Sequence, residues 1–332
     1  MNDSQNSTCE VLMHHYAITT EVDDLRFTYI SNSILNSLLS HSAIMLNIVT
    51  IYAIRKTSSF PKTLKTLLLS LAVSDIGVGC LVQPFYTSLL IKNLVEEIPS
   101  CNTFNMFGIT LGLFSMASFL GVVAVSVDRF LAVQLHLRYQ ELVTHKRVVA
   151  VVISIWLLSV FLTSWILWVP FLVHSIFLII FGLSFFLVTT TVYLKIYMTV
   201  RHHKKQIQSL QRLRQVEMAN TVNVLKSALG IFYVYLVFVA CYLPYMMCLV
   251  LADTTVTNNS TKVLYFFSYT FLFMNSSLNP VIYCWKMRHI RHAIMDTLRN
   301  MPWNRKQIYS SWHRSAVTTE SAADLKTLKY NL

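Results

Sequence analysis

Long stretches without Asp, Glu, Lys or Arg follow one another along the chain, and short polar or basic segments separate them. Six such stretches hold at most one charged residue each: 27–54, 66–91, 98–127, 148–194, 227–252 and 263–285. A membrane-spanning helix needs about 20 apolar residues, so the 47-residue stretch 148–194 has room for two helices, divided near Pro170. The pattern predicts an all-α membrane protein, a seven-transmembrane helix bundle with spans at 27–54, 64–91, 101–134, 148–170, 172–200, 221–251 and 262–284.

The predicted bundle, residues 27–284, lies between two polar segments. We expect residues 1–26 to form an extracellular amino-terminal tail and residues 299–332 a cytoplasmic tail. Between the bundle and that tail, residues 285–298 place apolar side chains at helical spacing with Lys and Arg opposite. This arrangement predicts a short amphipathic helix that lies on the inner leaflet.

The basic residues are distributed unevenly. The chain carries 27 Lys and Arg against 15 Asp and Glu, a net charge of +12. With the amino terminus outside, all the Lys and Arg fall on cytoplasmic segments except Arg26, Lys92 and Lys262. Because such residues gather on the cytoplasmic side, we predict a multi-pass plasma membrane protein with an extracellular amino terminus. Membrane topology and contact with membrane lipids therefore account for the basic charge, and no nucleic acid partner is expected.

The predicted outer segments carry features of an extracellular surface. Asn2, Asn6 and Asn259 fit the Asn-x-Ser/Thr pattern and are predicted glycosylation sites. Cys9 and Cys101 are the two cysteines that lie plainly outside. Because the outside is oxidising, these two cysteines can form a disulfide. The alternative is that both remain free thiols, and the sequence leaves the two alternatives open.

Short motifs occur in a fixed order along the predicted spans. The longer ones are Leu71-Ala72-Val73-Ser74-Asp75, Asp128-Arg129-Phe130, Phe238 with Cys241-Tyr242-Leu243-Pro244, and Asn279-Pro280-Val281-Ile282-Tyr283. Single residues add to them in the first, fourth and fifth spans: Asn47, Trp156 and Tyr193. Together they resemble the Leu-Ala-x-x-Asp, Asp-Arg-Tyr, Phe-x-x-x-Cys-Trp-x-Pro and Asn-Pro-x-x-Tyr motifs of rhodopsin-like (class A) G protein-coupled receptors. The resemblance covers residues 27–298.

This resemblance implies a receptor, not an enzyme, that transmits an extracellular ligand signal to a heterotrimeric G protein by shifting between two helix arrangements. Arrestin and receptor kinases are further partners that it implies. The residues it assigns to the switch and to G protein coupling are Asp128, Arg129, Tyr193, Phe238, Tyr242, Pro244, Asn279, Pro280 and Tyr283. Phe130 and Tyr242 replace the family's usual Tyr and Trp, and Val224 stands near the place of an acidic residue. Since a second ionic restraint on Arg129 is thereby missing, we expect appreciable basal activity.

Asp75 is the lone carboxylate within a predicted span, and burying it without a partner is costly. The family positions that surround a sodium ion carry oxygen-bearing side chains here: Asn47, Asp75, Ser118, Asn275, Ser276 and Asn279. Oxygen ligands suit a hard cation, so an allosteric sodium ion is expected, and no other cofactor. The alternative is a protonated Asp75 in a water-filled polar network.

Two features narrow the subgroup within the family. Residues 137–147 resemble the second internal loop of adenosine and melanocortin receptors. The second outer loop lacks the usual Cys and the fifth span lacks the usual Pro, as in melanocortin, cannabinoid and lysophospholipid receptors. The resemblance therefore extends to the group that holds these four kinds of receptor.

The predicted ligand pocket is aromatic and largely uncharged. Leu111 stands where amine receptors have Asp, and Phe273 stands near the Lys of opsins, which argues against a biogenic amine and a light sensor. The side chains expected to face the pocket are Gln83, Tyr86, Leu111, Ser115, Trp165, Tyr245 and Tyr269. They favour a neutral or lipophilic small molecule or peptide. The alternatives are a receptor with constitutive activity and a multi-pass transporter or channel, for which the sequence offers neither an internal repeat nor a polar path.

Overall fold

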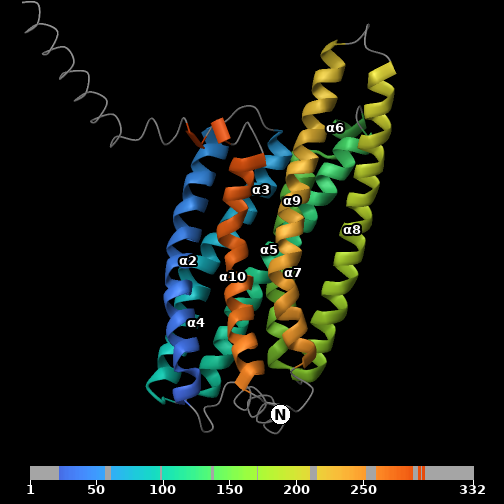
Figure 1. Cartoon of the computed structure of the whole chain (residues 1–332). Coiled ribbons are helices and arrows are strands. Elements are labelled where there is room, and N and C mark those ends of the chain that lie inside the picture. Colours follow the sequence, from blue (N-terminus) through green and yellow to red (C-terminus); the bar gives the residue numbers. More distant parts are fainter. Residues whose placement is uncertain are drawn as a thin grey trace, which may run out of the picture.

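The computed structural model describes residues 22–56, 61–97, 99–135, 138–169, 171–209, 215–251, 259–286, 291–292 and 294–295. Its main helices are α2 (Val22–Lys56), α3 (Lys62–Gly77), α4 (Gln83–Leu94), α5 (Cys101–Leu135), α7 (His145–Ser164), α8 (Phe171–Ser209), α9 (Gln215–Leu251) and α10 (Asn259–Lys286). A π-helical turn, η1 (Val78–Val82), joins α3 to α4, so this part of the chain forms seven long helical segments that run side by side (Figure 1). The predicted fold, an all-α seven-helix bundle, is confirmed.

The helices have the length and the composition that a membrane requires. Within the described residues, six are long and apolar enough to cross a bilayer, and they correspond to α2, α3–η1–α4, α5, α7, α8 and α9. The seventh, α10, has 28 residues but holds many polar side chains. Those of Ser268, Asn275, Ser276 and Asn279 are buried, so α10 turns its polar groups into the bundle and away from lipid.

Proline residues interrupt three of the helices. Pro84 cannot donate to the carbonyl four residues earlier, and the π turn η1 lies just before it. Pro244 lies inside α9 and Pro280 inside α10. Each removes one backbone hydrogen bond, which makes these positions the natural places for α9 and α10 to bend.

The two ends of the bundle differ. One end, called the α6 end below, holds Lys56, Lys62 and the short helix α6 (Tyr139–Leu142), and α8 and α9 extend past the other helices there (Figure 1). The opposite end, called the Cys101 end, holds the turn after Leu94 and the start of α5.

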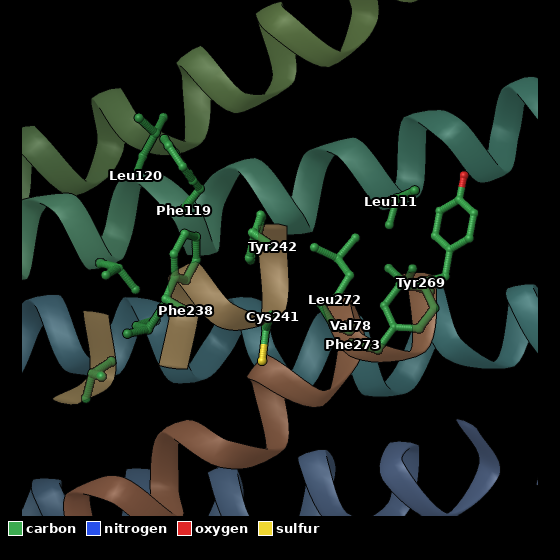
Figure 2. Close-up of a cluster of buried hydrophobic side chains, with 14 of the residues drawn as sticks. Val78, Leu111, Phe119, Leu120, Phe238, Cys241, Tyr242, Tyr269, Leu272 and Phe273 are labelled. Atoms are coloured by element: carbon green, nitrogen blue, oxygen red, sulfur yellow. The ribbon is translucent and has the colours of Figure 1, made fainter. Parts of the chain in front are cut away.

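Helix α5 is the central element of the packing, because it contacts α3, α7, α8 and α9. Helix α10 packs between α9 and α2. Figure 2 shows the core where these helices meet: Phe119 from α5 lies beside Phe238 and Tyr242 from α9, with Leu272 from α10 nearby. Aromatic side chains of α5 and α9 thus pack together inside the bundle, between its Cys101 end and its α6 end.

The predicted boundaries of the bundle stay predictions. Helix α2 begins at Val22, inside the predicted tail 1–26, and residues 1–21 and 299–332 lie outside the described residues. Within the predicted amphipathic segment 285–298, residues 291–292 and 294–295 are helical and Ile294 is buried. The remaining residues after Lys286 lie outside the described part.

The predicted extracellular features fall partly outside the described residues, which include neither Asn2, Asn6 nor Cys9. Cys101 is disulfide-bonded. Asn259 opens α10, and its side-chain amide donates a hydrogen bond to Asp24 Oδ2 at 3.1 Å. This bond joins the starts of α10 and α2 at the Cys101 end.

Candidate functional site

Arg129 and Asp128 form a buried ion pair near the α6 end, on the last turns of α5. Arg129 Nε donates to Asp128 Oδ2 at 2.9 Å, and Nη2 donates to the same oxygen. The side chains are both only 4% exposed, so the guanidinium is held inside the bundle by its neighbour. A buried charge is stable only when it is paired, and the pair therefore holds Arg129 away from other partners.

Tyr139 of α6 attaches the ion pair to a neighbouring helix. Its hydroxyl donates to Asp128 Oδ1 at 2.6 Å and lies 3.1 Å from Thr63 Oγ1 at the start of α3. Burial, and then the hydrogen bond to Asp128, raise the pKa of the Tyr139 phenol to about 12, so it is a neutral donor at ordinary pH. Asp128 is thus bound from two sides, by Arg129 and by α6.

Tyr193 of α8 makes a separate contact with α5. Its hydroxyl lies 2.7 Å from Ser126 Oγ, and Ser126 in turn donates to Val122 O at 2.7 Å. The Tyr193 ring stacks on Tyr235 of α9 with ring centroids 5.0 Å apart. Tyr283 of α10 is also buried, but its hydroxyl has no hydrogen-bond partner among the described residues.

Asp75 lies in a buried polar cluster between α3, α5 and α10. Asn279 Nδ2 donates to Asp75 Oδ2 at 2.9 Å, and Asn47 Nδ2 donates to Ser276 O at 2.9 Å. Five oxygens of the family's sodium positions have no hydrogen-bond partner in the described part of the chain: Asn47 Oδ1, Asp75 Oδ1, Ser118 Oγ, Asn275 Oδ1 and Asn279 Oδ1. One carboxylate among neutral oxygens is a donor set that suits a monovalent hard cation, so these residues fit the expected sodium ion.

Tyr242 of α9 links the aromatic core to α5. Its ring stacks on Phe238 with centroids 4.0 Å apart, and both rings contact Phe119 (Figure 2). The Tyr242 hydroxyl donates to Ser115 O at 3.1 Å. A tryptophan at this position would carry an indole N–H in place of that hydroxyl.

A cavity of about 120 Å³ adjoins this core on the side of the Cys101 end. It lies between α5, α7, α8, α9 and α10. Aromatic and aliphatic side chains make up most of its wall, and Tyr242 is among them. The described residues that line it include no Asp, Glu, Lys or Arg. Such a cavity can hold an uncharged, mainly apolar molecule in contact with the aromatic core.

The structure brings together only some of the residues predicted for the ligand pocket. Leu111, Ser115, Tyr245 and Tyr269 line the cavity. Gln83, Tyr86 and Trp165 are not part of its lining: Gln83 and Tyr86 are fully buried, and Trp165 packs on Phe177 at a ring distance of 4.9 Å.

Several site residues were not predicted from the sequence. Tyr139 contacts Asp128, Ser126 contacts Tyr193, and Thr63 contacts Tyr139. Each of these contacts joins two different helices, so no local pattern in the sequence indicates it. Thr163 and Ser175 line the cavity. Ser and Thr in membrane helices usually bond their own backbone, so a Ser or Thr in a span does not by itself indicate a site. Since the sequence contains many Ser and Thr in its spans, nothing marked out these two.

Known proteins resemble this chain in sequence and in fold. The chain is 27% identical over 309 residues to adenosine receptor A3 of Ovis aries, covering 85% of this chain and 92% of that receptor. It is 25% identical over 270 residues to melanocortin receptor 3 of Rattus norvegicus, covering 77% and 81% of the two chains. The crystal structure of squid rhodopsin matches with a TM-score of 0.74 at 20% identity, covering 87% of this chain and 84% of that one, which shows the fold alone.

The family model described as "7 transmembrane receptor (rhodopsin family)" matches residues 46–170 and 163–283. These ranges reach into all seven helical segments, with only the last part of α2 in the first of them, and they include every motif named above. The resemblance to this family, and to its adenosine and melanocortin receptors, is confirmed. The chain therefore belongs to the rhodopsin family of seven-transmembrane receptors, whose members are not enzymes.

Proposed function

We propose that this receptor binds a neutral, largely apolar ligand in the cavity and activates a cytoplasmic heterotrimeric G protein at the α6 end. The observation that carries the proposal is the buried Arg129, held by Asp128 at the end of the bundle where basic residues gather. The amino terminus, with Asn2 and Asn6, is then extracellular, in agreement with the distribution of Lys and Arg.

The ion pair represents a resting arrangement. In that arrangement Arg129 is turned to Asp128, and Tyr193 is bound to Ser126 instead of reaching α10. In the signalling arrangement α9 bends at Pro244 and moves away from α5, which opens a cleft lined by Arg129, Tyr193 and Tyr283. The G protein binds this cleft and so selects the open arrangement.

The ligand acts on this equilibrium through the aromatic core. Tyr242 lines the cavity and also stacks on Phe238, so a ligand that contacts Tyr242 favours one position of α9 over another. The absence of Asp, Glu, Lys and Arg from the described cavity lining favours a neutral ligand, because burying an unpaired charge there is costly. The small volume favours a compact molecule over a folded peptide.

Sodium would favour the resting arrangement. Asp75, Ser118 and Asn279 would hold the ion, with Asn275 and Ser276 beside them, and it would supply a positive charge to the buried carboxylate. Because this donor set spans α3, α5 and α10, movement of α10 at Pro280 would disrupt it.

Basal signalling is a part of the same proposal. Asp128 is the one ion-pair partner of Arg129 within the described residues, so a single contact restrains the arginine. A population with Arg129 released therefore exists without ligand, and a receptor with constitutive activity is the second candidate function.

Nucleotide exchange on purified G proteins tests the proposal. The receptor is reconstituted in lipid nanodiscs, and exchange is measured on one representative of each G protein class. We expect faster exchange than in receptor-free discs for at least one class, and loss of that increase in the Arg129→Ala variant. Arg55→Ala, which removes an exposed arginine at the same end, is the matched control and retains the activity. An unchanged rate for every class would contradict the proposal.

A further inference from the structure

We propose that His174 is the residue of the cavity wall that recognises the ligand's polar group, and that this group is a weak acid, such as a carboxylic acid, on an otherwise apolar molecule. The inference rests on the proposed function in taking the cavity as the ligand site. It adds the chemical class of the polar group, the side chain that binds it, and a dependence of binding on pH.

His174 lies on the face of α8 that lines the cavity. An α-helix turns by about 100° per residue, so the residues four, seven and eight positions after His174 share its face. These residues are Leu178, Phe181 and Gly182, and all three line the cavity together with His174. The opposite face of α8 carries apolar side chains that are exposed on the outside of the bundle: Ile176, Ile180, Leu183 and Leu187.

The contacts of the lining face show that it is turned into the bundle. The Phe181 ring lies 6.2 Å from the ring of Phe119 on α5. A Cβ on Gly182 would lie 3.3 Å from Met246 Cε of α9. His174 precedes Phe181 by two turns on the same face, so its ring is directed to the same interior, near the start of α8.

The imidazole of His174 is half-buried and has no partner. It makes no hydrogen bond or ion pair with another described residue. In contrast, His41 of α2 has its Nδ1 at 2.7 Å from Ser37 O of its own helix. A neutral imidazole carries one N–H donor and one nitrogen acceptor, and leaving them unpaired away from water is costly. A ligand in the cavity can provide the missing partner.

No other group of the described lining changes its charge near neutral pH. Helix α8 packs against α5, α9 and the 3-10 turn η3 (Trp165–Leu167), and neither η3 nor the lining residues of α5 include a titratable side chain. The other titratable groups of the lining are phenols, which ordinarily titrate near pH 10. They belong to Tyr242 and Tyr245 of α9 and to Tyr265 and Tyr269 of α10.

Two contacts already occupy most of these phenols. The Tyr242 hydroxyl donates to Ser115 O, and the hydroxyls of Tyr265 and Tyr269 lie 2.9 Å apart. His174 is therefore the one basic group that the described lining offers to a ligand.

Basicity is the property that separates an imidazole from a hydroxyl or an amide, and an acid is the ligand group that gains from it. A carboxylic acid either donates a hydrogen bond to the imidazole or transfers its proton to it. In both cases the pair of ligand and His174 has no net charge, so no unpaired charge is buried in the apolar cavity. An ammonium would find no anionic side chain in the described lining. The ligand is therefore a lipophilic weak acid.

This pairing couples binding to the uptake of one proton. Between pH 7 and pH 8 a free carboxylic acid is ionised, because its ordinary pKa is about 4, and a free imidazole is mostly neutral. The complex holds one proton that neither free partner holds. Each unit by which the pH falls in this range therefore strengthens binding by up to about tenfold.

Three probes with one skeleton test this chemistry: 3-(4-fluorophenyl)propanoate, its primary amide, and the corresponding amine. Each is titrated by fluorine nuclear magnetic resonance against the full-length receptor in nanodiscs at pH 8, 7 and 6, with receptor-free discs as the lipid background. We expect the affinity for the acid to rise about threefold to tenfold from pH 8 to pH 7. The affinity for the amide should not depend on pH. Equal affinities for the acid at pH 8 and pH 6, or acid and amine bound equally well at pH 7, would overturn the proposal.

Variants assign the pH dependence to His174. His174→Asn keeps a donor and an acceptor but does not titrate, so its affinity for the acid should not depend on pH. His174→Phe lacks both and should bind the acid about tenfold more weakly than the wild type at pH 7. His41→Asn, at an exposed histidine of α2, is the matched control and should keep the wild-type pH dependence. A pH dependence that persists in His174→Asn would refute the role of His174.

Two further readouts distinguish recognition by His174 from a structural role and from the signalling function. The ligand-free unfolding midpoint of His174→Asn should equal that of the wild type, because the ring bonds no other described residue; a lower midpoint would indicate a structural role instead. Nucleotide exchange is measured on the same wild-type sample. Exchange with pH-independent acid binding would reject the inference on His174 alone, and pH-dependent acid binding without exchange would reject the proposed signalling function alone.

Discussion

The side-chain amide of Asn279 donates a hydrogen bond to Asp75 Oδ2 at 2.9 Å, which joins α10 to α3 inside the bundle. The other carboxylate oxygen, Asp75 Oδ1, is buried and has no partner within the described residues. Asn279 directly precedes Pro280, where α10 lacks a backbone hydrogen bond. A cation at Asp75 is therefore positioned to affect the place at which α10 bends.

Sodium should stabilise the resting receptor through Asp75. We expect a higher unfolding midpoint in sodium chloride than in choline chloride for the ligand-free wild type. At a sodium concentration of ten times Kd, the stabilisation would be about 1.4 kcal/mol. Asp75→Asn should abolish the difference between the two salts, and Ser118→Ala should reduce it. Equal midpoints in both salts, or a difference that persists in Asp75→Asn, would argue against a sodium site.

Removal of the Tyr139 hydroxyl should raise basal signalling. The Tyr139→Phe variant loses the donor to Asp128 Oδ1 and the contact with Thr63, so Asp128 is held less firmly and releases Arg129 more often. A net hydrogen-bond contribution of about 0.5–1.5 kcal/mol corresponds to an increase of about twofold to tenfold in ligand-free nucleotide exchange. Tyr52→Phe, at an exposed tyrosine of α2, serves as the control and should match the wild type. Equal basal rates for both variants would disprove a restraint at Tyr139.

The Tyr139 hydroxyl should make the free energy of unfolding depend on pH in the alkaline range. The pKa of Tyr139 is raised in the folded protein from 10.0 to about 12, by burial and then by the bond to Asp128. A raised pKa means that the folded state holds the phenolic proton more tightly than the unfolded state. This contribution is present below about pH 10 and is lost as the pH rises toward about 12. Chemical unfolding of the wild type and Tyr139→Phe across this range should therefore show stabilities that converge; a constant gap would contradict the shift.

A cation–π contact at the α6 end should restrain α9. Lys286 Nζ lies 3.8 Å from the Tyr233 ring centroid on α9 and 3.5 Å from that of Trp285 beside it on α10. Such contacts contribute about 0.5–2 kcal/mol, so Lys286→Met should raise basal exchange about twofold to thirtyfold. Lys286→Arg keeps a cation over the rings and should resemble the wild type. If the Met and Arg variants have the same basal rate, the contact has no part in restraining α9.

The amino-acid sequence was sufficient for the helices and the motifs, because charge-free stretches and Asn-Pro-x-x-Tyr are local patterns. The sequence did not predict how each helix is rotated about its own axis, and therefore which of its side chains face the pocket. Gln83 and Tyr86 were expected in the pocket, yet the π turn Val78–Val82 precedes them, and a residue inserted into a helix turns all later side chains by about 100°. Contacts such as Tyr139 with Asp128 depend on how a short loop helix folds back on α5, and no periodicity encodes that.

The most direct test of the proposed switch measures the movement of α9. Spin labels are attached at position 62, at the start of α3, and at position 218 in α9, with Cys80 and Cys284 replaced by serine. Distances between the labels are then measured by pulsed electron resonance, with and without a nucleotide-free G protein. The proposed mechanism predicts a second, longer distance population that grows when the G protein is added and that Arg129→Ala prevents. A single distance distribution that stays the same in all samples would contradict a switch based on α9.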